Sequence, residues 1–205
     1  MIRIRKCCKG AEACGFERYA PLTRDFVEMA QAEGFATELE RMSFKAPPPT
    51  LPVATHEMAH AGSALSIGVP VRAIECFYVD IDFDRVSATD KAFVLLAGPA
   101  GEDYADRLIR RRVDYVWLEA IDFVRRGVGG NCDACRSVRG FLAEEPNADD
   151  ENLIARLRAA EARAIAFITE DLDRWLNIRT AAHALLKHGS MSGEEITEVL
   201  NGDAK

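Results

Sequence analysis

The stretch Thr55-His56-Glu57-Met58-Ala59-His60 is an H-E-x-x-H motif inside a small, apolar run from Leu51 to Ile67. If that run is a helix, His56 and His60 lie one turn apart on one face, where both imidazoles can reach one metal ion. Glu57 then lies one position further round the helix. From there its carboxylate can act as a general base on a water molecule beside the ion, instead of competing for the ion.

The flanks of this motif favour a buried helix. Thr50 suits an N-cap, Pro52 falls in the first turn where a missing N–H costs little, and Gly68 with Pro70 ends the element. A lone histidine on a helix is more often a packed or surface residue than a ligand. Here, however, two of the four histidines in the chain flank one glutamate at the required spacing, which predicts a metal site.

The composition is that of an ordinary globular protein. The 205 residues are 48% apolar and 29% charged, which allows one domain with a sizeable core. The net charge of -7 argues against a nucleic acid or an anionic membrane surface as a partner. No run approaches the roughly 18 apolar residues of a membrane span, and no apolar region follows the basic N-terminus. We therefore expect a soluble, cytoplasmic protein.

Patterns along the chain predict a mainly α fold with a small β element. The stretch from Val71 to Phe83 alternates apolar and polar residues, interrupted at Glu75, as in a half-buried strand or a bent pair of strands. The first expected helices are a short one within Pro21–Met42, a long one over Ser87–Arg112 that is interrupted at Gly98-Pro99, and a helix or ordered connection over Val113–Val124. A further helix is expected from an Asn131 N-cap to about Ala143, followed by helical periodicity over Leu153–Ile168 and Leu172–Leu186. The capping box of Ser192 and Glu195 predicts a last helix.

The stiff Pro47-Pro48-Pro49 segment suggests a division into an N-terminal extension with a short helix (1–46) and the main domain (47–205). The six cysteines read as reduced thiols or metal ligands, because no export signal is present. The sequence assigns no role to Cys7, Cys8, Cys14, Cys132 or Cys135. The C-x-x-C formed by Cys132 and Cys135 lacks both a βαβ context and a matching second pair, which favours a packing role over redox chemistry or a metal clip.

A catalytic metal normally takes three protein ligands, so a third must come from outside the motif. The candidates are Asp133, Cys132, Cys135, Glu75 and Glu102. Asp133 has the best local argument, because a carboxylate at a helix start, just after a glycine turn, is held rigidly and stays ionised near the positive end of the helix.

Several segments in this order resemble the peptidase domain of the FtsH-type zinc proteases, peptidase family M41. The matching segments are residues 54–61 (ATHEMAHA), 95–102 (LLAGPAGE), 129–133 (GGNCD), 181–186 (AAHALL) and 191–196 (MSGEEI). The resemblance covers about residues 50–202. It implies a helical zinc-metallopeptidase domain in which His56, His60 and Asp133 bind Zn²⁺ and Glu57 is the catalytic base.

The resemblance also implies that the strand within Val71–Val79 borders the cleft and can bind an extended peptide by edge pairing. The small residues before Glu102 would let their helix approach the metal helix closely, with Glu102 in a structural role. Two positions depart from the family pattern, since Ala59 replaces the usual Gly and Cys132 the usual Asn.

The sequence contains no G-x-x-x-x-G-K-[ST] loop and no membrane anchor, so the ATPase of FtsH-type proteases is not expected. We therefore expect a zinc metalloendopeptidase that hydrolyses flexible or unfolded polypeptides, unless a separate partner delivers its substrates. The alternative is a non-catalytic peptide- or partner-binding protein that retains the metallopeptidase fold. In a third interpretation, a structural metal is closed by four ligands, with Cys132 or Cys135 among them. Neither the cleavage preference nor the oligomeric state follows from the sequence.

Overall fold

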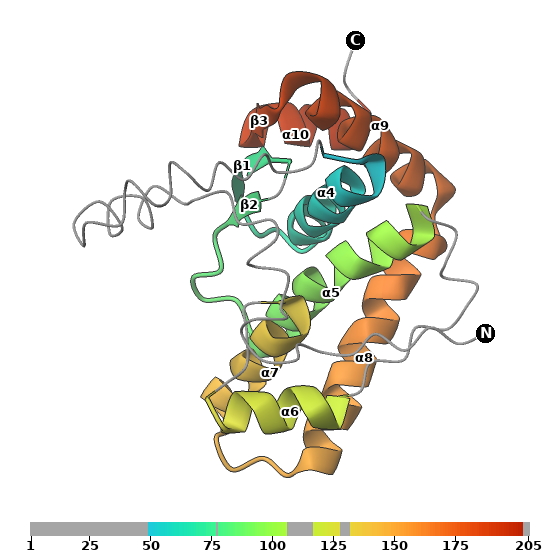
Figure 1. The fold of residues 1–205 in the computed structure, drawn as a ribbon. Coiled ribbons are helices and arrows are strands. Elements are labelled where there is room, and N and C mark those ends of the chain that lie inside the picture. The colour runs from blue at the N-terminus through green and yellow to red at the C-terminus, as the bar shows by residue number, and fades with distance from the viewer. Residues whose placement is uncertain (1–48, 77, 106–116, 128–131, 203–205) are drawn as a thin grey trace, which may run out of the picture.

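The computed structural model describes residues 49–76, 78–105, 117–127 and 132–202. The short helix expected within Pro21–Met42, the cysteines at 7, 8 and 14, and the proposed boundary at residue 46 lie outside them. In these ranges the fold has seven helices and a small antiparallel sheet that packs against α4, α9 and α10, which confirms a mainly α fold with a small β element (Figure 1). The elements are α4 (Leu51–Ser66), β1 (Val71–Glu75), β2 (Tyr78–Ile81), α5 (Ala88–Ala105), α6 (Trp117–Arg125), α7 (Asp133–Glu144), α8 (Asp150–Thr169), α9 (Leu172–His188), β3 (Ser190–Ser192) and α10 (Gly193–Leu200).

Helix α4 carries the H-E-x-x-H motif and lies at the centre of the fold. It begins after Thr50 with Pro52 in its first turn, as predicted, although the Thr50 side chain makes no capping hydrogen bond. Helix α5 crosses α4 closely: a Cβ atom added at Gly101 would lie 2.6 Å from the Cβ of Ala59. The predicted close crossing at the Gly98–Gly101 segment is therefore confirmed, with Pro99 inside α5.

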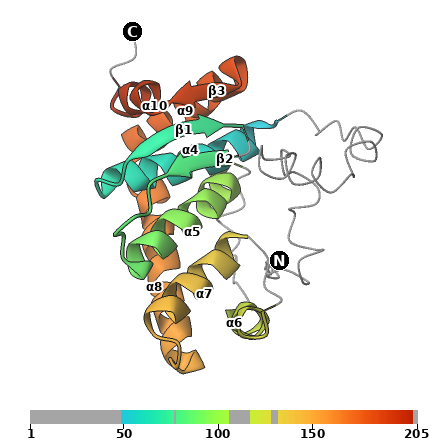
Figure 2. The ribbon, with the colours of Figure 1, turned by 90° about the vertical axis from the view of Figure 1, so that its left-hand side faces the viewer.

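The remaining helices pack around this pair. Helices α7 and α8 contact α5, and α9 contacts α4, so that one core runs through the described residues (Figures 1 and 2). Its largest fully buried side chains come from all seven described helices and from β1; they include Met58, Ile74, Leu96, Ile121, Phe141, Leu157, Ile178 and Ile196. The predicted capping box is present, since the Ser192 and Glu195 side chains each accept a hydrogen bond from the other residue's backbone N–H.

Helix α7 begins later than the sequence suggested. Asn131 was the expected N-cap, but the N-cap is Cys132, whose backbone is extended (φ -65°, ψ 158°) and whose carbonyl accepts the first helical hydrogen bond, from the Arg136 N–H at 2.9 Å. Asp133 is therefore the first residue of the helix. The glycine-rich sequence before this helix contains no side-chain pattern that could locate the helix start to within one residue.

The sheet has the order β2-β1-β3, with both pairs antiparallel (Figure 2). The expected bent pair of strands is thus present as β1 and β2. The strict alternation expected along the first strand is wrong, because a register irregularity between Val71 and Ala73 exposes Ala73 and buries Ile74. Strand β3 was not predicted, since three residues of Ser-Met-Ser are too short to show a period of two.

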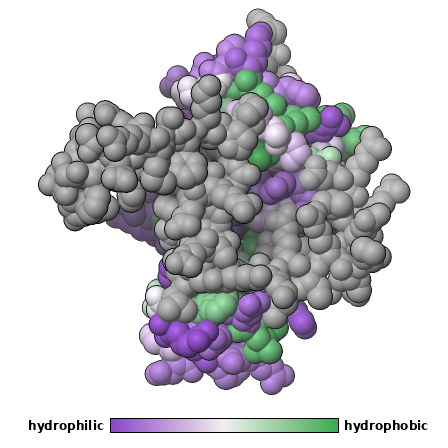
Figure 3. All heavy atoms as spheres, in the orientation of Figure 1, coloured by the Kyte–Doolittle hydropathy of each residue, from purple (hydrophilic) through white to green (hydrophobic). Residues whose placement is uncertain are grey.

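Polar and apolar side chains are both visible among the described residues on the face shown in Figure 3. In Figure 3, hydrophilic residues predominate at the lower end, where α6 and the start of α8 lie, with a few apolar residues among them. None of the described helices combines the length and the apolar character that crossing a membrane requires.

The close crossing of α4 and α5 gives a first prediction. Gly101→Ala should lower the free energy of unfolding by about 1–3 kcal/mol, because the short Ala59 side chain cannot move out of the way of the new methyl group. Gly140→Ala is the matched control, since a Cβ there would lie 3.7 Å from the Ala88 Cβ, an ordinary contact. It should be neutral or stabilise by up to about 1 kcal/mol through helix propensity. Denaturant unfolding measures both; equal effects would contradict the close crossing.

Candidate metal centre

Three of the predicted site residues converge between α4 and α7. One ligand atom from each of His56, His60 and Asp133 can be chosen so that all three atoms lie within 4.8 Å of one another. The Asp133 Oδ2 atom lies 3.2 Å from His56 Nε2 and 3.7 Å from His60 Nε2. A carboxylate 73 positions beyond the second histidine thus joins the two histidines, and the three residues could bind a metal ion.

The ring of His60 is oriented by a backbone carbonyl of α5. Its Nδ1 lies 2.7 Å from the Val94 carbonyl oxygen, and since a carbonyl can only accept, Nδ1 carries the proton. The neutral tautomer therefore has its lone pair on Nε2, which faces Asp133. His60 is almost fully buried, so this hydrogen bond holds the ring in one orientation.

The ring of His56 is oriented by a carboxylate. Its Nδ1 lies 3.0 Å from Glu102 Oε2, and its Nε2 faces Asp133. A metal-binding histidine commonly donates its second ring N–H to a carboxylate, which fixes the tautomer and makes the other nitrogen a better ligand. Glu102 therefore orients the His56 ring and does not belong to the three-residue group.

Gly98 leaves the space that both imidazoles need. A Cβ atom there would overlap His60 Nε2 and would lie 2.8 Å from His56 Nε2. These are the two nitrogens that face Asp133. Because Gly98 has no side chain, these nitrogens stay accessible. The space beside them and the set of donor atoms both fit a bound ion.

Protonation in this cluster follows from burial and from the surrounding carboxylates. Burial alone lowers the pKa of His56, but hydrogen bonds to Asp133 and Glu102 and the charges of Asp133 and Glu57 outweigh it and raise that pKa to about 10. Burial dominates at His60 and lowers its pKa to about 4. Burial opposes ionisation of Asp133, yet the two histidines and Arg136 together lower its pKa to about 2.

Glu57 lies next to this group along α4. Burial raises its pKa to about 7, assisted by the negative charges of Asp133 and Glu102 and opposed by His56 and Arg136. A carboxyl group with a pKa near neutrality can both accept and donate a proton, which suits a general base that later acts as an acid.

The other predicted candidates for the third ligand do not join the three-residue group. Glu75 is exposed on β1, Cys135 is fully buried on α7, and Cys132 caps the same helix. The metal-binding group found among the described residues contains no cysteine. Two imidazole nitrogens and one carboxylate match the donor set of divalent metal sites that keep a position open for a substrate.

One charged residue of the site was missed by the sequence reasoning. Arg136 lies one turn after Asp133 on α7, with its Nη1 atom 3.9 Å from Asp133 Oδ1. The i,i+3 spacing from a predicted ligand was the signal that could have indicated it.

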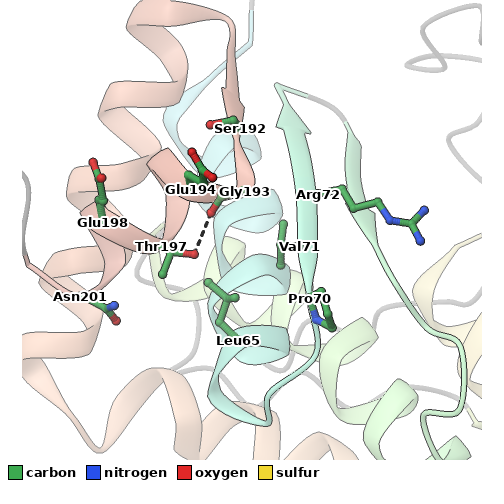
Figure 4. A pocket seen from close by; sticks show the side chains of 10 residues that line it. All are labelled: Leu65, Pro70, Val71, Arg72, Ser192, Gly193, Glu194, Thr197, Glu198 and Asn201. Carbon is green, nitrogen blue, oxygen red and sulfur yellow. Dashed lines mark hydrogen bonds between the residues drawn. The ribbon is translucent and has the colours of Figure 1, made fainter.

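A groove of about 770 Å³ lies elsewhere on the molecule, between the end of α4, β1 and α10 (Figure 4). Leu65, Pro70 and Val71 lie on one side and Glu194, Thr197 and Glu198 on the other. None of the residues that line it belongs to the metal-binding group.

No protein-family model matches this sequence, and no curated protein matches it.

The bond between Glu102 and His56 gives a second prediction. Glu102→Gln should weaken metal binding about 10- to 100-fold, because a neutral amide supports the basicity of the imidazole less well than a carboxylate does. Titration of the protein against a metal-binding dye measures the affinity. Glu151→Gln, on an exposed position of α8, is the charge-matched control and should leave it unchanged. Equal affinities for the two variants would remove Glu102 from this role.

The protonation of His56 gives a third prediction. Its pKa of about 10 lies above neutral pH, so the metal-free protein holds a proton that a metal must displace. Binding at about pH 8 should release about one proton per ion, and the release should disappear only as the pH rises through the pKa of His56. Calorimetry in buffers with different ionisation enthalpies counts the released protons. A heat of binding that does not depend on the buffer would contradict the assignment.

Proposed function

We propose that this protein is a zinc-dependent metallopeptidase of the FtsH type, peptidase family M41, acting on flexible or unfolded polypeptides. The observation that carries the proposal is the convergence of His56, His60 and Asp133 beside Glu57. Two histidines from one helix, a carboxylate from another and an adjacent glutamate are the parts that metal-assisted hydrolysis uses. Zinc is the ion that this donor set suits best.

A zinc ion held by these three residues would supply a Lewis acid that polarises the peptide carbonyl and makes water nucleophilic at neutral pH. The chain's own residues supply the remaining chemistry. Glu57 accepts a proton from the attacking water at its carboxylate and passes it to the leaving amine, a transfer helped by its pKa of about 7. The hydrogen bonds to Val94 and Glu102 keep both imidazoles oriented throughout.

The sheet supports the binding of an extended peptide. In the described residues, β2 pairs with β1 on one side and with no strand on the other. Both strands contact α4, the helix that carries the site (Figure 2). A peptide can therefore hydrogen-bond along the outer edge of β2 while its scissile bond reaches the metal centre. Such edge pairing needs an extended chain, so flexible or unfolded polypeptides, free or delivered by a partner, are the proposed substrates.

The role of Glu57 gives the decisive test. Glu57→Gln should retain the fold and the metal but lose about 10²- to 10⁴-fold in the hydrolysis of labelled, unfolded casein, because the amide cannot accept the proton. Glu151→Gln should keep full activity. Hydrolysis retained in Glu57→Gln would remove this residue from the base role. If the metal-loaded wild type binds peptides but cleaves none, the protein is a non-catalytic binder with the same site.

The metal ligands are tested separately by elemental analysis of the native protein. About one zinc per chain is expected in the wild type, with a loss or sharp weakening in both His60→Ala and Asp133→Ala, since two ligands alone hold the ion poorly. A wild-type protein that contains no zinc, and takes up none when it is added, would contradict the proposed site.

A further inference from the structure

Arg136 is the residue at the metal centre that the proposed chemistry does not use. It lies on the first turn of α7 after Asp133, and its side chain is 47% exposed. Asp133 directs Oδ2 toward the two histidines and Oδ1 toward Arg136. The carboxylate of Asp133 therefore contacts the guanidinium through one oxygen and faces the histidine nitrogens that would hold the ion with the other.

The geometry of Arg136 differs from that of six other ion-paired arginines in the described ranges. Arg72, Arg125, Arg126, Arg156, Arg163 and Arg174 each lie 2.6–3.4 Å from a carboxylate oxygen. The 3.9 Å separation between Arg136 Nη1 and Asp133 Oδ1 is longer than a hydrogen bond. Asp133 thus holds Arg136 near the site by charge without using its N–H donors, which leaves them available to a ligand.

We propose that Arg136 is a specificity-determining residue whose guanidinium binds a carboxylate of the peptide substrate beside the metal centre. The proposal rests on the peptidase function proposed above. A planar guanidinium can bind a carboxylate through two parallel hydrogen bonds, which gives both orientation and charge selectivity. The carboxylate can be the C-terminal group of the peptide or the side chain of an Asp or Glu near the scissile bond.

The location favours recognition over a purely structural role. A surface arginine that only neutralises its neighbour gains by closing to hydrogen-bond distance, as the six arginines above do. Arg136 is instead held at the edge of a buried acidic cluster that contains Glu57, Glu102 and Asp133, with about half of its side chain in contact with solvent. Three carboxylates of this cluster would repel an incoming carboxylate, so Arg136 adds attraction for an acidic ligand at the exposed edge of the site.

The binding test needs no turnover. It uses zinc-loaded, full-length protein and a series of hydroxamates, which bind zinc, bearing a terminal carboxylate on linkers of increasing length; the matched amides are the controls. For at least one linker, the carboxylate should bind the wild type about 10- to 100-fold more tightly than its amide, as expected for a charge-assisted hydrogen bond. This preference should vanish in Arg136→Gln and be partly retained in Arg136→Lys. Arg158→Gln, on an exposed position of α8, is the charge-matched control and should keep it.

Cleavage profiling distinguishes the two sources of the carboxylate. A mixture of unfolded peptides is digested by the wild type and by Arg136→Glu, and the cut sites are identified by mass spectrometry. Enrichment of Asp or Glu at one fixed position points to a side chain. Cuts at a fixed distance from the C-terminus, abolished by amidation, point to the terminal carboxylate. In either case Arg136→Glu should lose the preference, and at a side-chain subsite it should favour Lys or Arg instead.

Three results would overturn the proposal. The first is that the wild type binds the acid and the amide of every pair equally. The second is an acid preference that survives in Arg136→Gln. The third is that Arg136→Gln changes the zinc affinity alone, which would make Arg136 a positioning residue for Asp133. An acid preference without any peptide cleavage would instead retain this inference and reject the peptidase function.

Discussion

The structure depends on the close crossing of α4 and α5. Because Gly98 and Gly101 have no side chain, the backbone of α5 can approach α4 so closely that a methyl group at either position would overlap side-chain atoms of α4. This approach brings the Val94 carbonyl to His60 and the Glu102 carboxylate to His56. The same contact that closes the core therefore orients both imidazoles, so stability and site geometry have one physical origin. A larger side chain at either glycine would disturb both.

The electrostatics of the centre follow from its burial. Three carboxylates and two imidazoles lie close together in a largely buried volume, with the half-exposed guanidinium of Arg136 at its edge, and each charge acts strongly on its neighbours. His56 is held between Glu102 and Asp133 and keeps its proton far above neutral pH, whereas the more buried His60 is neutral. A divalent ion bound here would take the place of the proton between His56 and Asp133 and would reduce the negative charge of the cluster.

The centre is asymmetric in its surroundings. Glu102 supports it from α5, while Arg136 adds a positive charge from α7 on the other oxygen of Asp133. Strand β2 supplies a backbone edge near the same helix α4. A substrate held along that edge and near Arg136 would be recognised both by its extended backbone and by its charge. These two modes of recognition come from elements that are distant in the sequence.

Local patterns in the sequence by themselves determined the helix of the H-E-x-x-H motif, the capping box of the last helix and the mainly α class, because spacing and capping act over a few residues. For the third position beside the two histidines they left several candidates, of which Asp133 had the best local argument. Only the tertiary structure decided the rest. The irregularity between β1 and β2, which buries Ile74 in place of Ala73, depends on how these two strands pair, and the pairing of β3 with β1 joins residues more than a hundred positions apart. The orientation of His60 by Val94 and of His56 by Glu102, and the position of Arg136, exist only once α4, α5 and α7 are packed, because no local pattern encodes which side chains meet across a core.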